Sequence, residues 1–426
     1  MRYFSTNSKT SFSNFKDVLF KGVADDNGLF IPESVPYFDK SFFESKMNYP
    51  DIAFEMMKPF VGDFFNNSEL SEITNSAYPF ETPLISLNKN LHIMELFHGP
   101  TFAFKDYAVR FMARCMERLL DKDVTLLVAT SGDTGSAVAN GFLGLKGIKV
   151  VILYPSGRVS DIQEKQLTTY GKNITALEVL GSFDDCQRMV KKAFLDNSIK
   201  SRLNLTSANS INIVRLLPQS IYYVWAWKQL DAKNTPIIFS IPCGNFGNIT
   251  GGILAKRMGL PIKKLIASTN ANDVFPNFLK NGEFYPKPSI RTIANAMDVG
   301  NPNNINRILY LYQYDIDKIR KDLLSWSFSD NSLKKEIKKI KIKNDYILDP
   351  HTAVGVLGIQ KYTSSQKETH NNIVLATAHP AKFYDIIEPI IEEKIILPIE
   401  LENSMKKQKN SIIIPAKYSS LKEFLI

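Results

Sequence analysis

Residues 124–154 of this 426-residue chain read VTLLVATSGDTGSAVANGFLGLKGIKVVILY. The unbroken apolar run at residues 124–129 predicts a fully buried strand. Residues 136–145 are interpreted as a helix, and a second apolar run at 150–154 predicts another strand. Strand–helix–strand order with apolar strands is typical of parallel sheets whose two faces are covered by helices, so the fold class is expected to be α/β.

The same alternation continues on both sides of this unit. Further strands are expected at residues 91–97, 174–180, 237–241, 264–267 and 373–376. Helices are expected at residues 107–120, 161–170, 184–196, 211–230, and after a glycine-rich turn to about 258. Pro218 is expected to bend the longest of these helices. Ligands of parallel sheets bind at the carboxyl ends of strands, where the motifs described below fall.

The N-terminal part of the chain has a different character. Its first 80 residues are aromatic-rich and irregular, and DNGLFIP at residues 26–32 predicts a turn followed by a short apolar run. Pro79 and Pro83 mark a boundary. We therefore expect an N-terminal domain at residues 1–80 and a larger region, residues 81–426, made of two interleaved α/β subdomains.

Composition argues against several classes of protein. Hydrophobic residues make up 44% and charged residues 22% of the chain, which are ordinary globular values. No apolar run reaches the length of a membrane span, and residues 1–16 have no apolar core of the signal-peptide kind, so we expect a cytoplasmic protein. The 3 cysteines and 5 histidines are scattered without metal-ligand spacing, so we expect no metal site.

The formal net charge of +9 makes a nucleic-acid-binding protein one alternative. In the densest basic run, KKEIKKIKIK at residues 334–343, the lysines are interrupted by Ile337, Ile340 and Ile342. This pattern is typical of a helix or strand with one solvated face. We therefore expect neither a nucleic-acid nor a membrane partner, and the positive field would slightly favour an anionic substrate.

A lysine stands between a predicted strand and a predicted helix in the segment HGPTFAFKD, residues 98–106. Lys105 follows Phe102 and Phe104, and Asp106 is a candidate N-cap of the helix. An apolar setting at the positive end of a helix favours the neutral amine, which is the form that attacks an aldehyde. The alternative is a lysine whose stem covers apolar surface while its charge reaches solvent.

A glycine-rich turn, CGNFGNITGG at residues 243–252, follows the strand expected at 237–241. Glycines allow several backbone N–H groups to face one point, and the start of the next helix adds positive potential there. The turn is neither a Walker loop nor GxGxxG, because no Lys-Ser or Lys-Thr follows Gly252 and two residues separate Gly244 from Gly247. It favours a small phosphate-bearing cofactor over a nucleotide, and the alternative is a tight packing turn.

Two further segments end predicted strands. TSGDTGS at residues 130–136 places hydroxyl and N–H groups at a helix start, which suits a carboxylate or phosphate, although an ordinary N-cap is the alternative. IVLATAHPAK at residues 373–382 is a strand that ends in a polar turn, where Thr377 can direct its hydroxyl into a cleft.

Taken together, HGPTFAFKD, ATSGDTGSA, GNFGN and ATAHPAKF resemble threonine synthases, which are pyridoxal 5′-phosphate (PLP) enzymes of the tryptophan-synthase β-subunit fold group. The resemblance covers nearly the whole chain, including DNGLFIP, SANSIN at residues 207–212 and DPHTA at 349–353. It implies PLP fold type II, with largely parallel sheets in two subdomains that form a PLP-binding catalytic region. It also implies an N-terminal α/β extension, a threonine-synthase-type domain of the bacterial and fungal branch.

The resemblance implies a role for each motif. Lys105 forms a Schiff base with PLP and moves protons once the substrate has displaced it, and Thr377 hydrogen-bonds the pyridine nitrogen. Asp133 stands where many relatives carry an Asn beside the ring oxygen of the cofactor. The cofactor phosphate is expected at Gly244, Asn245, Phe246, Gly247 and Asn248, and the substrate carboxylate near Ser131, Gly132, Thr134 and Gly135.

The implied reaction converts O-phospho-L-homoserine and water into L-threonine and phosphate, the last step of threonine biosynthesis. The freed amine of Lys105 removes a proton from Cα and then one from Cβ, phosphate leaves from Cγ, and water adds at Cβ. We expect a monomer with a small-molecule substrate. The departing phosphate needs cationic and hydroxyl partners, for which the candidates are Ser156, Arg158, Asn209 and Arg215.

Two alternatives share these motifs. A PLP-dependent serine or threonine dehydratase would also need Lys105, the phosphate cradle and the carboxylate loop, and it would be identified by formation of a 2-oxo acid. The N-terminal segment and ATAHPAKF argue against it. A non-catalytic relative is the second alternative, against which the intact Lys105 and GNFGN count.

Overall fold

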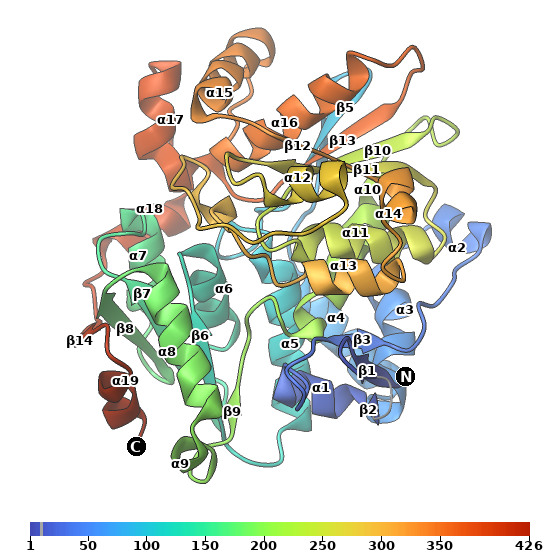
Figure 1. Cartoon of the computed structure of the whole chain (residues 1–426). Coiled ribbons are helices and arrows are strands. Elements are labelled where there is room, and N and C mark those ends of the chain that lie inside the picture. Colours follow the sequence, from blue (N-terminus) through green and yellow to red (C-terminus); the bar gives the residue numbers. More distant parts are fainter. Residues whose placement is uncertain (9–11) are drawn as a thin grey trace.

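The computed structural model describes residues 1–8 and 12–426, which form two large β-sheets, one small sheet and the helices that cover them (Figure 1). Both large sheets are built of parallel strands, apart from one edge strand. The α/β class expected from the sequence is therefore confirmed.

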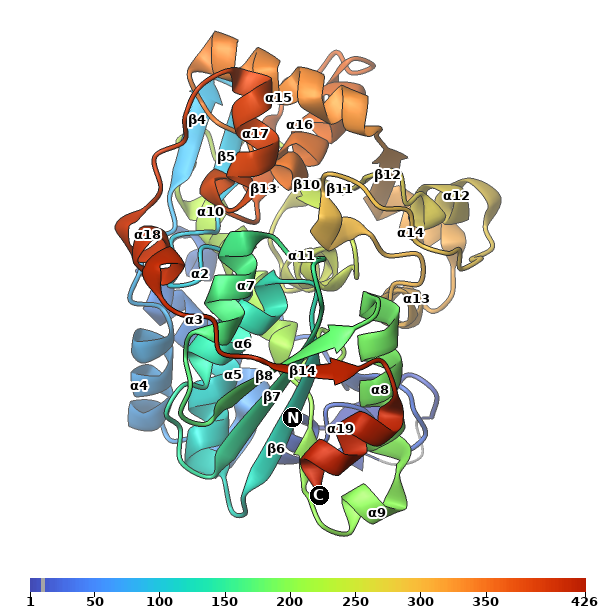
Figure 2. The ribbon, with the colours of Figure 1, turned by 90° about the vertical axis from the view of Figure 1, so that its left-hand side faces the viewer.

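The five-stranded sheet is parallel throughout, with the order β14-β8-β7-β6-β9. Its strands are β6 (Val124–Ala129), β7 (Ile148–Pro155), β8 (Ile174–Leu180), β9 (Leu205–Thr206) and β14 (Ile412–Pro415). Figure 2 shows helices on both faces of this sheet, which explains why its central strands are mostly apolar and buried. The helices are α5 (Lys105–Leu119), α6 (Asp133–Gly141), α7 (Asp161–Thr168) and α18 (Ile399–Lys406) on one side, and α8 (Phe183–Leu195), α9 (Asn197–Lys200) and α19 (Tyr418–Leu425) on the other.

The six-stranded sheet has the order β12-β11-β10-β13-β5-β4, in which only β4 runs antiparallel to its neighbour. Its strands are β4 (Leu84–Asn88), β5 (Leu91–Glu95), β10 (Ile237–Pro242), β11 (Ile262–Thr269), β12 (Leu323–Ser327) and β13 (Asn371–Ala376). Its helices are α10 (Ile221–Lys228), α11 (Gly247–Arg257), α12 (Val274–Asn281), α13 (Ile305–Leu311), α14 (Ile316–Asp322), α15 (Asp330–Asn344), α16 (Pro350–Thr363) and α17 (Tyr384–Ile391), with 3₁₀ turns η4 (Asn295–Met297) and η5 (Pro380–Phe383).

The N-terminal part contains both strands and helices, so the α/β extension expected there is confirmed, although its sequence is aromatic-rich and irregular. The strands β1 (Tyr3–Ser5), β2 (Phe12–Ser13) and β3 (Phe30–Pro32) form an antiparallel sheet. Capping boxes begin two of the helices, since Asn14 pairs with Asp17 and Asn66 with Glu69. The helices are α1 (Phe15–Lys21), α2 (Lys40–Glu44), α3 (Tyr49–Val61) and α4 (Asn67–Ala77), with the 3₁₀ turn η1 (Gly62–Phe64).

The long helix expected at residues 211–230 is broken into three pieces, so that prediction was wrong in its first half. The pieces are η2 (Ile213–Arg215), η3 (Leu217–Ser220) and α10. The Asn212 side chain accepts from the N–H of Val214 and starts the first turn, and Pro218 at the start of the second has no N–H to donate. The residues before Pro218 thus form short turns instead of a continuous helix.

The structure also places the expected N-cap Asp106 and the basic run at residues 334–343. Asp106 is not an N-cap, because α5 already begins at Lys105 and the Asp106 carboxylate accepts from the N–H and hydroxyl of Thr101 instead. The basic run lies in α15, where Ile337 and Ile340 are buried while Ile342 is exposed. Within the described part of the chain, no helix is both long and apolar enough to cross a membrane.

Candidate active site

The four motifs lie at the carboxyl ends of four parallel strands, namely β5, β6, β10 and β13. Two of the loops are joined through their backbones. The N–H of Phe104 donates to the carbonyl of Thr377 at 2.9 Å, and the N–H of His379 donates to the carbonyl of Phe102 at 3.0 Å. Lys105 and the buried Thr377 are therefore brought next to each other from segments about 270 residues apart in the chain.

Lys105 is partly buried at the first position of α5, and its Nζ lies 4.3 Å from the centre of the Phe104 ring. Burial lowers the pKa of Lys105 to about 8, and the positive charge of Arg215 acts in the same direction. The Asp133 carboxylate opposes the change. An exposed lysine has a pKa of about 10.4. Near neutral pH, a larger fraction of Lys105 than of an exposed lysine is therefore the neutral, nucleophilic amine.

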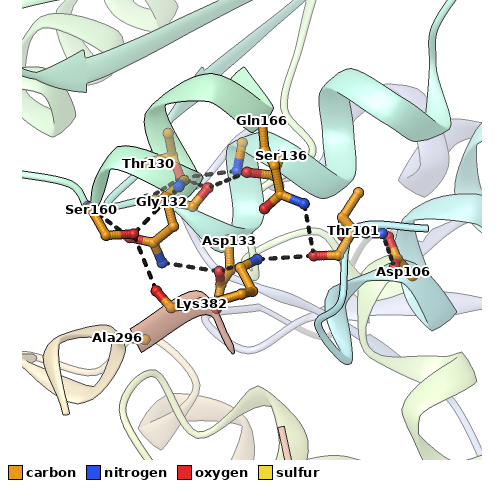
Figure 3. A network of polar contacts seen from close by, with 12 residues as sticks. Thr101, Asp106, Thr130, Gly132, Asp133, Ser136, Ser160, Gln166, Ala296 and Lys382 are labelled. Carbon is orange, nitrogen blue, oxygen red and sulfur yellow. Dashed lines mark hydrogen bonds and ion pairs between the residues drawn. The ribbon is translucent and has the colours of Figure 1, made fainter. Parts of the chain in front are cut away.

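Asp133, the first residue of α6, forms a buried ion pair in the network that Figure 3 shows. Its carboxylate lies 2.7 Å from Lys382 Nζ and accepts from Gln163 Nε2 at 3.0 Å. Burial by itself raises the pKa of Asp133, but Lys382 and Gln163 together outweigh burial and lower it. Asp133 is therefore ionised, which the sequence left open.

The same network connects three of the motifs. Lys382, which is fully buried, also donates to the carbonyl of Thr101 at 2.9 Å (Figure 3). Gly132 has a φ of +137°, and a Cβ there would lie 2.5 Å from the Gln163 side chain, so only glycine suits this position. The Thr130 hydroxyl accepts from the N–H groups of Gly132 and Gly135 and stiffens the loop at residues 131–135. Ser131 and Thr134 flank Asp133 in this loop and are partly exposed.

The glycine-rich turn ends at the start of α11 with Phe246 in the left-handed region, at a φ of 61°. The first N–H groups of a helix have no partner within the helix, so those of α11 remain available to an anion. The Asn248 side-chain oxygen accepts from the hydroxyls of Tyr222 and Tyr223 at 2.7 and 2.8 Å. Its amide nitrogen is buried and has no hydrogen-bond partner in the described chain. These unfilled donors suit a phosphate group.

Arg215 is almost completely buried, and its guanidinium forms no ion pair with a carboxylate among the described residues. One of its terminal nitrogens donates to the Ala208 carbonyl, while its Nε has no partner. Burial lowers the pKa of Arg215 to about 10, so the group is still charged near neutral pH. The neighbouring Asn209 also has a buried side-chain oxygen without a partner. The Asp106 carboxylate raises the pKa of Arg215 but forms no ion pair with it, so burial prevails. A buried cation that is so little compensated marks a place where an anionic ligand would be stabilised.

Comparison with known sequence families gives three matches along the chain. The profile described as "Pyridoxal-phosphate dependent enzyme" matches residues 76–377, "Threonine synthase N terminus" matches residues 2–78, and "Threonine synthase, C-terminal" matches residues 352–425. The chain belongs to the threonine synthase family. The threonine synthase of Buchnera aphidicola subsp. Acyrthosiphon pisum is 41% identical over 435 residues that cover 100% of both chains.

Solved threonine synthases have the same fold along the full length. The Escherichia coli enzyme is 38% identical, with a TM-score of 0.93 over 100% of this chain and 99% of that one. The PLP-bound enzyme of Brucella melitensis is 33% identical, with a TM-score of 0.94 over 100% and 98%. This threonine synthase family member therefore has PLP fold type II and is a PLP-dependent enzyme. The unfilled donors of the glycine-rich turn and the lowered pKa of Lys105 fit that cofactor.

Four residues are suggested by the sequence as partners of the substrate phosphate, and they fall into two groups. Arg215 lies near Lys105, because its charge affects the pKa of Lys105. Asn209 precedes Ser210, which Asn304 connects to the carbonyl of Asn245 in the glycine-rich turn. Ser156 instead donates to Glu178 at 2.6 Å, in a cluster with Lys409 and the C-terminal segment. Arg158 is exposed, and no described residue pairs with it. The structure thus brings Arg215 close to Lys105, whereas no hydrogen bond or ion pair among the described residues joins Ser156 or Arg158 to Lys105.

Sequence reasoning missed several polar residues that build the site. Lys382 lies in the motif ATAHPAKF, but Asp133, the acid with which it pairs, lies 249 positions earlier in the chain. Gln163, in α7, carries no local signal of its contact with Asp133. Asn304, beside α13, donates to the Asn245 carbonyl at 2.9 Å from a segment with no recognised motif. Only the folded arrangement reveals these partners.

Proposed function

We propose that this protein is a threonine synthase that converts O-phospho-L-homoserine and water into L-threonine and phosphate. The observation that carries the proposal is the buried Arg215, which lacks a carboxylate partner and lies near an amine of lowered pKa, Lys105. A substrate that has both an amino group and a phosphate group suits both side chains, because its amine can take the place of Lys105 on the cofactor and its phosphate can pair with Arg215. The cytoplasmic location and the monomeric state expected from the sequence remain predictions.

The cofactor would be held by loops that follow strands of the six-stranded sheet. We assign its phosphate to the turn of Gly244, Asn245, Phe246, Gly247 and Asn248, and its pyridine nitrogen to the Thr377 hydroxyl. PLP, when bound, acts as an electron sink that acidifies the carbon-bound protons next to the substrate amine. A neutral hydroxyl at the pyridine nitrogen makes the ring less electron-withdrawing than an acid would, which suits elimination and replacement at Cβ and Cγ.

Lys105 is assigned two tasks. It carries the cofactor between turnovers, and its Nζ then takes the proton first from Cα and later from Cβ of the substrate. A pKa of about 8 supports this assignment, because a general base works best when its pKa is near the working pH. The loop with Ser131, Gly132, Thr134 and Gly135 would orient the substrate carboxylate at the start of α6.

Arg215 and Asn209 are assigned to the phosphate that leaves from Cγ. A buried guanidinium stabilises the negative charge that grows on the departing group more strongly than an exposed one would, because water screens it less. Water then supplies the hydroxyl at Cβ. The protons taken from Cα and Cβ and the remaining proton of water go to Cγ, which becomes the methyl group, to Cα and to the released phosphate, so the products are threonine and hydrogen phosphate. Ser156 and Arg158 remain the second candidate pair for the same phosphate.

The test is an absorbance spectrum of the purified protein with PLP, before and after O-phospho-L-homoserine is added. We expect a visible absorbance band of the bound cofactor, and we expect borohydride reduction to attach the cofactor permanently to Lys105, as located by peptide mass spectrometry. After substrate is added, phosphate and threonine should form in equal amounts. Lys105→Ala should lose the band and both products, while Lys122→Ala, at an exposed lysine of a turn, should retain them. A 2-oxo acid formed from serine or threonine, without phosphate release from phosphohomoserine, would identify a dehydratase instead.

A further inference from the structure

Arg307 is the largest fully buried side chain of the described structure and is not one of the residues assigned above. It lies in α13 and forms no ion pair with a carboxylate in the described chain. Burial lowers the pKa of its guanidinium to about 9. A buried arginine without a counter-ion is costly unless its hydrogen bonds are all well placed, so its contacts indicate what it is for.

The guanidinium of Arg307 donates to three backbone carbonyls from two distant parts of the chain. Its Nε donates to Phe30, in β3 of the N-terminal part, at 2.9 Å. Its two terminal nitrogens donate to Ile211 at 2.5 Å and to Ser210 at 3.3 Å. Figure 1 shows α13 directly beside β3. Arg307 therefore fastens the loop at residues 207–212, which leads to Arg215, to the N-terminal part.

Asn304 extends this arrangement to the glycine-rich turn. Its side-chain oxygen accepts from Arg307 at 2.6 Å. Its side-chain nitrogen donates to the carbonyls of Asn245 at 2.9 Å and Ser210 at 3.3 Å. Arg307 and Asn304 thus set the position of the 207–212 loop relative to the turn assigned to the cofactor phosphate.

The N-terminal part holds the same loop at a second point. The side-chain nitrogen of the fully buried Asn212 donates to the carbonyl of Leu19, in α1, at 3.0 Å, and to that of Ser207 at 3.2 Å. The loop that contains Asn209 is therefore anchored on β3 through Arg307 and on α1 through Asn212. Both anchors are hydrogen bonds to backbone carbonyls, which define position without altering the charge of the site.

We propose that Arg307 is a positioning residue for substrate recognition. Through its bond to the N-terminal part, it holds Asn209 and Arg215 at a fixed distance from the cofactor site. This is the distance that a substrate phosphate on Cγ requires. The inference rests on the proposed function, because it takes the phosphate of O-phospho-L-homoserine as the ligand of Arg215. A displacement of about 1 Å in such a site is enough to reduce catalysis about 100-fold. The N-terminal part would then act in selecting the substrate and not only in folding.

The test compares two ligands of the PLP-loaded enzyme by calorimetry. One is the phosphonate analogue of the substrate in which a methylene replaces the ester oxygen, and the other is the same amino acid without the phosphonate. Arg307→Lys keeps the charge but cannot make the full set of bonds, so we expect it to weaken phosphonate binding about 10-fold, the loss that a charged hydrogen bond would give. Binding of the amino acid without phosphonate should change less than about twofold.

Two further variants separate positioning from a general loss of structure. Asn212→Ser loosens the same loop from its second anchor without touching Arg307, and it should give the same selective loss of phosphonate binding. Arg291→Lys, at an exposed arginine, should leave both ligands unchanged. In turnover, Arg307→Lys and Asn212→Ser should raise KM for O-phospho-L-homoserine more than they lower kcat.

The inference would be overturned if Arg307→Lys and Asn212→Ser weakened both ligands equally, or neither, while wild type released phosphate and threonine normally. That result would assign Arg307 a structural role alone. If wild type bound the phosphonate no more tightly than the plain amino acid and released no phosphate, the proposed function would fail, and the inference with it.

Discussion

The carboxylate of Asp133 and the ammonium of Lys382 lie 2.7 Å apart, and Lys382 is fully buried. Lys382 also donates to the carbonyl of Thr101, so it connects the loop before α5 with the start of α6 (Figure 3). The pair is neutral as a whole, yet it holds an ionised carboxylate in the buried part of the site. Its two members belong to different sheets, and their contact therefore fixes how the two halves of the site meet.

Replacing one member of this pair should lower the free energy of unfolding more than replacing both members. Lys382→Met leaves the buried Asp133 carboxylate without its cation, which typically costs about 3–5 kcal/mol. The double variant Asp133→Asn with Lys382→Met leaves no buried charge and should recover much of that loss. Urea unfolding of the cofactor-free protein, followed by circular dichroism, measures both. A double variant less stable than Lys382→Met would show that the Asp133 charge is not what the lysine stabilises.

The contribution of the pair should also depend on pH in a defined direction. The pKa of Asp133 is lowered in the folded protein, so the stabilisation is complete above the pKa of an unfolded aspartate, about 3.9, and is lost as the pH falls through the folded value. The stability difference between wild type and the double variant should therefore be constant from about pH 5 to 7 and shrink below about pH 4. Urea midpoints of both proteins across this range would check it, and a difference independent of pH would contradict it.

The sequence predicted more of the fold than of the site. Mostly apolar runs such as Val124–Ala129, in which only Thr125 is polar, carry their own signal, because a parallel strand buried on both faces needs few polar residues. Short elements such as β12 and β14 were not predicted, since they have few residues and partly exposed faces. The break before Pro218 depends on the Asn212 side chain, which accepts from a backbone N–H of the first turn and is itself held by the distant carbonyl of Leu19, a contact that no local pattern reveals.

Within the site, loops of unusual composition could be recognised, but their supporting residues could not. Glycines and a lysine at a helix start point to phosphate and amine chemistry in the sequence itself. Lys382 and Arg307 are single basic residues in a chain with 52 lysines and arginines, and only their burial distinguishes them. Long-range pairing of this kind is a property of the folded state and has no signature at fixed spacing.

The lowered pKa of Lys105 should be visible in how the cofactor-free protein takes up PLP. Only the neutral amine reacts with the aldehyde, so the rate should rise with pH and reach its half-maximum near pH 8, well below the value of an ordinary lysine. Arg215→Gln removes a positive charge that lowers this pKa and should move the midpoint upward. Stopped-flow absorbance from pH 7 to 10, with Arg158→Gln as the control, measures the midpoints. A midpoint that does not move in Arg215→Gln would contradict the proximity of Arg215 to Lys105.

Arg215 and Arg158 can be distinguished as partners of the substrate phosphate. Arg215 is buried with an unpaired Nε, whereas Arg158 is exposed on the loop after β7. Loss of a buried charged hydrogen bond costs about 1.5–3 kcal/mol, so Arg215→Gln should lower kcat/KM for O-phospho-L-homoserine about 10- to 100-fold and weaken inhibition by inorganic phosphate.

Arg158→Gln should change kcat/KM less than about threefold, as expected for an exposed charge that only steers the substrate. Both variants are tested by continuous measurement of phosphate release, with the cofactor band recorded to show that each protein is loaded. The opposite result, a large loss in Arg158→Gln alone, would mean that the five-stranded sheet moves toward the six-stranded sheet when substrate binds. Ser156 would then have to exchange its bond to Glu178 for one to the phosphate.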